Sequence, residues 1–117
     1  MKDLEHREQV AVVKWFDLSY PAFRGRLFAV PNGGHRHVAV AAKLKAEGVR
    51  PGVPDLWLPV QRKGFAGLVI ELKAKGGKLQ PNQAEWLDFL GQQGYMAVLC
   101  VGADAAMQTI KDYLSGH

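Results

Sequence analysis

The segment Gly67 to Lys73, with the sequence Gly-Leu-Val-Ile-Glu-Leu-Lys, most strongly constrains the fold. Its apolar, partly β-branched composition predicts a strand, and Gly76-Gly77 ends it. Successive side chains of a strand point to opposite faces, so Glu71 and Lys73 share one face. The other face is apolar and points into the core: Leu68, Ile70 and Leu72. This alternation allows charged side chains to sit on an otherwise buried strand.

The rest of the chain alternates between helical and strand-like patterns. The expected elements are a helix at 5–18, a strand at 26–30, a helix at 36–47, strands at 55–60 and 67–73, a helix at 81–92, a strand at 95–101 and a helix at 104–114. The order α-β-α-β-β-α-β-α predicts an α/β fold in which helices flank both faces of a mixed central sheet. With 117 residues, 48% of them hydrophobic, the chain suits a single domain, residues 1–117.

The composition narrows the cellular context and the partners. A single cysteine excludes an internal disulfide, and the apolar run around Cys100 predicts a buried thiol. The charged N-terminus does not resemble a signal peptide, and no apolar run is long enough to span a membrane. We therefore expect an intracellular, cytoplasmic protein. The formal net charge of +4 suits a polyanionic partner such as nucleic acid, although many basic proteins bind none.

The strands 55–60 and 67–73 form a possible hairpin with its turn near Lys63. Antiparallel pairing around that turn places Asp55 opposite Glu71, with Cβ atoms about 4.5–5.5 Å apart. Two carboxylates that close repel each other, and burial increases the repulsion unless a cation neutralises them. Mg²⁺ takes few protein carboxylates and fills its shell with waters and phosphate oxygens. Lys73 would then stabilise charge developing on a phosphate or orient the attacking water.

A simpler interpretation of the same residues stays open. Glu71 and Lys73 also fit an ordinary salt bridge on a strand, and an aspartate after a proline, such as Asp55, is often a turn or cap residue.

In its motifs the chain resembles the PD-(D/E)xK nucleases, which carry Pro-Asp and then Glu-x-Lys on the next strand. Here those motifs are Pro54-Asp55 and Glu71-Leu72-Lys73. The closer resemblance is to the VRR-NUC (virus-type replication-repair nuclease) branch, over about Glu5 to Tyr113. It is carried by Glu8-Gln9, Pro31 to Gly34, Gly48 to Leu56, Glu71 to Lys73, and Leu79 to Gln83 followed by Trp86. The resemblance implies a restriction-endonuclease-like sheet.

The resemblance also implies a role for each matching residue. Asp55, Glu71 and the backbone carbonyl of Leu72 would hold Mg²⁺ or Mn²⁺, and Lys73 would be the catalytic lysine. Glu8 would be an extra acid of the first helix that reaches the metal directly or through water. Gln83 would lie near the active site on the helix after the core. Taken alone, Glu8 fits a solvated helix face and Gln83 fits a polar residue at a helix N-terminus.

Stand-alone members of the family, from phages and bacteria, resemble structure-specific endonucleases that cut four-way (Holliday) junctions as homodimers. The resemblance thus implies a metal-dependent DNA endonuclease for DNA repair, acting as a homodimer on branched DNA. Two alternatives stay open: a non-catalytic DNA-binding module or subunit of a repair or packaging assembly, and a nuclease that prefers flaps, single strands or RNA. The sequence does not discriminate among these substrates.

Polar and basic residues near the motifs are candidates for DNA contact. They are Asn32, Gly33, His35, Arg36, Lys43, Arg50, Lys75 and Lys78. A plain turn at Asn32-Gly33 and a solvated face around His35 and Lys43 explain these residues equally well.

Overall fold

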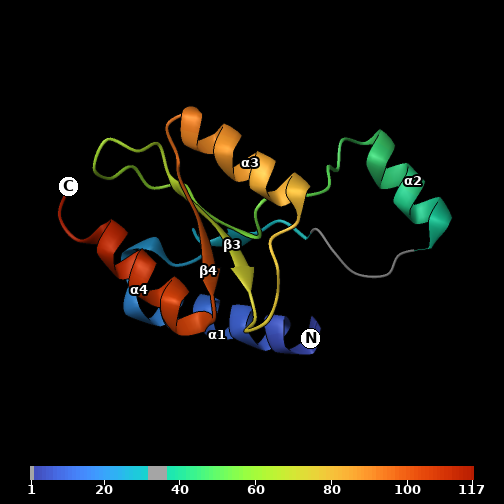
Figure 1. Cartoon of the computed structure of the whole chain (residues 1–117). Helices are drawn as coiled ribbons and strands as arrows, with labels where there is room; N and C mark the ends of the chain where they lie inside the picture. The colour runs from blue at the N-terminus through green and yellow to red at the C-terminus, as the bar shows by residue number, and fades with distance from the viewer. Residues whose placement is uncertain (1, 32–36) are drawn as a thin grey trace.

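The computed structural model describes residues 2–31 and 37–117 (Figure 1). Its elements are α1 (Lys2–Ser19), the 3₁₀ helix η1 (Pro21–Phe23), β1 (Phe28–Ala29), α2 (Val38–Ala46), β2 (Leu56–Leu58), β3 (Leu68–Lys73), α3 (Pro81–Gln92), β4 (Met96–Val101) and α4 (Ala103–Leu114). The order of helices and strands confirms the expected α/β fold, with η1 added after α1. Of the expected DNA contacts, Asn32, Gly33, His35 and Arg36 lie outside the described residues.

Two strands are shorter than the sequence pattern predicted. The strand expected over 55–60 is reduced to β2, because Pro59 has no N–H to donate to a ladder. The strand expected over 26–30 is reduced to β1, which pairs only with the short β2. The sheet therefore tapers toward β1, and β3 and β4 carry most of its length.

The sheet is mixed and has the order β1-β2-β3-β4. β1, β2 and β3 pair antiparallel, whereas β3 and β4 pair parallel. A parallel connection needs a crossover, and α3 provides it between β3 and β4. Figure 1 shows α1 and α4 packed together on one side of the sheet and α3 on the other. Helices on both faces of a mixed sheet were the sequence prediction, and the structure confirms it.

The hydrophobic core lies between the sheet and the pair α1–α4. The predicted apolar face of β3 is buried there, with the flanking leucines of β2. The helices contribute Val12, Phe16, Ala106, Ile110 and Tyr113 to the same cluster. Cys100, predicted to be buried, is 4% exposed. Because β3 is buried along its whole length, every charged group on it is withdrawn from water.

The turn between β2 and β3 lies at Lys63-Gly64, where Arg62 pairs with Phe65. Lys63 and Gly64 have φ values of 54° and 85°, and positive φ at both central residues is the requirement of a type I′ turn. Further along the ladder, Leu56 pairs with Ile70. The predicted register is thus confirmed where β2 pairs with β3, and the turn lies near Lys63 as predicted, although its Arg62–Phe65 pair is offset by one residue from that register.

α2 differs from the other long helices because it stands apart from the sheet (Figure 1). None of its residues is buried. No helix in the described part of the chain is long and apolar enough to cross a membrane.

Candidate active site

The β2–β3 register continues past the end of β2 and places Asp55 opposite Glu71. The Asp55 Oδ2 atom accepts a hydrogen bond from the amide of Leu72, at 2.8 Å. In a strand, the N–H and C=O of one residue point to the same edge, so the Leu72 carbonyl faces the side on which Asp55 lies. The hairpin therefore gathers two carboxyl groups and a backbone carbonyl at the end of β3.

Glu71 and Lys73 are the buried charged residues of this site. They are 3% and 8% exposed, and Glu71 Oε2 lies 3.6 Å from Lys73 Nζ. Their position on one face of β3, with the leucines and isoleucine on the other, follows the predicted alternation. The second oxygen of Glu71, Oε1, is buried and has no hydrogen-bond partner within the described residues. A buried carboxylate oxygen without a donor is costly, so the site has the capacity to bind a further group there.

Burial dominates the acid–base behaviour of the carboxyl pair. Burial, followed by the nearby charge of Asp55, raises the pKa of Glu71 to about 8, although Lys73 opposes the shift. Burial also raises the pKa of Asp55, against the lowering effects of the Leu72 amide and Lys73. Two buried carboxyl groups that face each other share a proton more readily than they carry two full negative charges. Without a cation, the pair thus retains a proton at neutral pH.

The donor set fits a divalent cation with few protein ligands. Two carboxylates and a backbone carbonyl are oxygen ligands, which Mg²⁺ and Mn²⁺ accept. Within the described residues, no group of three or more His, Cys, Asp or Glu side chains forms a cluster able to hold a metal. A cation at this site would complete its shell with water and substrate oxygens, which is the usual arrangement for Mg²⁺.

The side chains of the two remaining predicted site residues, Glu8 and Gln83, accept hydrogen bonds from backbone amides at the starts of helices. The carboxylate of Glu8 accepts a hydrogen bond from the amide of Ala103, at the start of α4. Gln83 Oε1 accepts from the amide of Gln80 at 2.8 Å and belongs to the capping box of α3. These two side chains therefore stabilise helix N-termini in this structure.

Glu5 was not predicted from the sequence as a site residue; it lies one turn before Glu8 on the same side of α1. The charge of Glu5 raises the pKa of Asp55. A Cβ atom added to Gly77, in the loop after β3, would lie 3.5 Å from Glu5 Oε2. Glu5 is thus an α1 acid whose charge acts on Asp55. The available signal was its spacing from Glu8, but that spacing does not say which of two acids on one helix face approaches the sheet.

The described basic candidates for DNA contact fall into two groups. Lys75 and Lys78 are exposed in the loop that follows Lys73, beside the carboxyl pair. Arg50 is exposed in the loop before β2, and Lys43 is exposed on α2, away from the sheet. Lys75, Lys78 and Arg50 lie within five residues of the site motifs in sequence, whereas Lys43 does not.

Comparisons with known proteins identify relatives of the chain. The family model described as the VRR-NUC domain matches residues 3–104. A solved structure described as a VRR_NUC domain protein is 29% identical in sequence and superposes with a TM-score of 0.83. The match covers 95% of this chain and 88% of that chain. No curated protein matches.

Proposed function

The chain belongs to the VRR-NUC domain family, whose members are nucleases of the PD-(D/E)xK type. From that premise we propose that it is a metal-dependent endonuclease acting on branched DNA. One observation carries the proposal. The Pro-Asp and Glu-x-Lys motifs meet in one largely buried cluster, and the Oε1 atom of Glu71 in it has no hydrogen-bond donor among the described residues. A carboxyl pair that retains a proton, and that can exchange it for a divalent cation, fits metal-assisted hydrolysis.

In this proposal Asp55, Glu71 and the Leu72 carbonyl hold Mg²⁺ or Mn²⁺. The bound ion would supply Lewis-acid activation of water and phosphate. Lys73, held 3.6 Å from Glu71, keeps its ammonium group at the same place. There it stabilises negative charge on the phosphate being cleaved. Glu5 and Glu8 add negative charge from α1, and Gln83 holds the start of α3 beside the loop after β3.

Branched DNA is the proposed substrate class, and four-way junctions are the proposed preference. The exposed Lys75 and Lys78 beside the site suit contacts to the sugar–phosphate backbone. Paired cuts across a four-way junction need two active sites, whereas one chain has one carboxyl pair. The proposal thus includes a homodimer, and it places the protein inside the cell with its DNA substrate.

The test is cleavage of a labelled four-way junction with Mg²⁺, Mn²⁺ or EDTA. Lys73→Met keeps most of the side-chain length but removes the charge, so we expect cleavage to fall by at least about 100-fold. Lys14→Ala, on the exposed face of α1, is the matched control and should cut normally. Thermal unfolding and junction binding, measured on each variant, separate loss of chemistry from loss of structure.

The substrate panel extends to flaps, duplexes, single strands and RNA. Metal-dependent cutting of one of these, with the junction intact, would replace the junction by that substrate. Junction binding without cutting of any substrate in either metal would reject the nuclease and favour a DNA-binding module.

A further inference from the structure

α2 is an apolar helix without a buried face. Seven of its nine residues are valine, alanine or leucine. Val38 is 81% exposed and Val40 is 49% exposed. A helix this apolar on all sides is normally buried, and an isolated helix of nine residues is marginal in water. α2 therefore exposes an apolar surface that the described part of its own chain does not cover (Figure 1).

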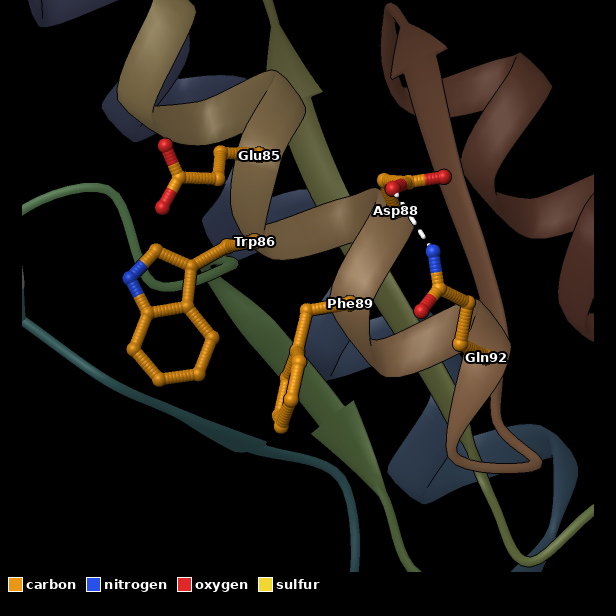
Figure 2. Close-up of a pocket in the computed structure, with 5 residues that line it drawn as sticks. All are labelled: Glu85, Trp86, Asp88, Phe89 and Gln92. Carbon is orange, nitrogen blue, oxygen red and sulfur yellow. Dashed lines mark hydrogen bonds between the residues drawn. The ribbon is translucent and has the colours of Figure 1, made fainter.

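The exposed face of α3 offers a surface with matching properties. A shallow pocket of about 430 Å³ lies along this face, lined by Glu85, Trp86, Asp88, Phe89 and Gln92. Figure 2 shows the rings of Trp86 and Phe89 projecting from the same side of the helix. Their centroids are 6.1 Å apart in an edge-to-face arrangement, and Phe89 is 51% exposed. Exposed aromatic rings at the centre of a patch are typical anchors of protein interfaces.

The two surfaces are complementary in charge as well as in polarity. The last turn of α2 carries Lys43 and Lys45, and α2 has no acidic residue in its first turn. In the α3 pocket Glu85 lies next to Trp86, and Asp88, which accepts a hydrogen bond from Gln92 at 2.9 Å, lies on the side away from the two rings (Figure 2). An apolar, basic helix and an aromatic, acidic groove fit the helix-in-groove mode of recognition.

We propose that α2 of one chain docks on the α3 pocket of a second copy, and that the second copy returns the same contact. Such a reciprocal exchange is a closed two-fold interface, in which each chain supplies one helix and one groove. α2 connects through Gly48 to Pro54 directly to Asp55. The interface thereby joins the two chains close to their carboxyl pairs, and it supplies the dimer on which the proposed junction cleavage rests.

The size of α2 sets the expected strength of the dimer. A helix of nine residues is about 14 Å long, so two docked helices bury less area than a typical obligate interface. We expect a dimer that dissociates on dilution into the micromolar range. Sedimentation or light scattering over a concentration series, without DNA or metal, measures this directly. Because neither DNA nor metal is present, an inactive enzyme that still dimerises would reject the proposed function and leave the interface intact.

Charge reversal tests the pairing of the two surfaces. Reversing Lys43 and Lys45 to Glu, or Glu85 and Asp88 to Lys, should each raise the dimer dissociation constant roughly tenfold. Combining all four changes in one chain should restore dimerisation. Lys14→Glu, an exposed reversal on α1, is the matched control and should leave it unchanged. Dimerisation that is insensitive to both reversals would overturn the assigned surfaces.

Cysteine cross-linking identifies where α2 docks. Under mild oxidation, Val40→Cys combined with Phe89→Cys in one chain should give a dimer-sized product on a non-reducing gel. A cross-linked product of monomer size would show that α2 folds back on its own α3, and would overturn the proposal. A wild-type protein that stays monomeric at every concentration would do the same. If the Lys43 and Lys45 reversal then weakened DNA binding, the helix would be a DNA contact instead.

Discussion

The raised pKa of Glu71 predicts an unusual dependence of stability on pH. In the folded protein burial raises the pKa of this carboxyl to about 8, against its ordinary value of 4.5. Between these two values the folded state binds a proton that the unfolded state has released. The free energy of unfolding should thus fall as pH rises from about 4.5 to about 8, and level off above that range. The raised pKa of Asp55 acts in the same direction.

The size of the effect follows from the shift. Each pKa unit corresponds to 1.36 kcal/mol, so the Glu71 shift amounts to at most about 5 kcal/mol over the whole range. The slope in the middle of the range is about 1.4 kcal/mol per pH unit, because one proton is involved. Domains of this size are stabilised by about 5–15 kcal/mol, so the loss is large enough to measure. Glu71→Gln removes the titrating group while keeping the side-chain shape. It should therefore reduce the slope by about 1.4 kcal/mol per pH unit, the contribution of one proton.

Urea unfolding between pH 5 and pH 8, in EDTA and at a fixed protein concentration, measures the slope. Glu47→Gln is the matched control, because Glu47 is exposed at the end of α2. It should show the wild-type slope. If wild type were flat over this range, or if Glu71→Gln kept the wild-type slope, burial would not hold a proton on Glu71 and the reasoning would be refuted.

Three further predictions concern other parts of the structure. Mg²⁺ should raise the melting temperature more at pH 8 than at pH 6, because the carboxyl pair must lose its proton to bind a cation; equal shifts would contradict this. Gly52→Ala should lose about 1–3 kcal/mol more stability than Gly94→Ala, since both glycines have positive φ but only a Cβ on Gly52 would meet the Asn82 backbone, at 2.9 Å. Tyr113→Phe should cost about 1 kcal/mol in denaturant unfolding, because the hydroxyl donates to the Val60 carbonyl at 2.6 Å.

The buried face of the hairpin was predictable because a local rule determines it. The alternation along Gly67 to Lys73 fixes which side chains are buried, and with them the side on which Glu71 lies. The turn at Lys63-Gly64 would by itself give a register shifted by one residue, because its Arg62–Phe65 pair is out of step with the Leu56–Ile70 pair. A shift of one residue would have placed Glu71 in the apolar core. The alternation therefore favours the register in which Asp55 lies opposite Glu71.

Contacts between distant segments were not predictable in the same way. Glu5 and Glu8 share one side of α1, and only the packing of α1 against the sheet and α4 decides which acid faces which neighbour. The sequence also predicted α2 correctly as a helix, but its even distribution of apolar residues does not indicate a buried face. What covers α2 depends on a surface elsewhere, and periodicity within one segment carries no information about that surface.

The choice between a structural ion pair and a metal site turns on the second oxygen of Glu71. A salt bridge that served stability alone would need donors for both oxygens, since a buried charge is stabilising only when it is fully paired. Lys73 contacts Oε2, whereas the ionised group has no donor for Oε1 within the described residues. Asp55 adds a second carboxyl group next to Glu71, and it donates nothing to Oε1, because its own Oδ2 atom accepts a hydrogen bond from the Leu72 amide. A buried carboxyl pair that holds a proton and leaves one oxygen without a donor favours a binding site over a structural pair.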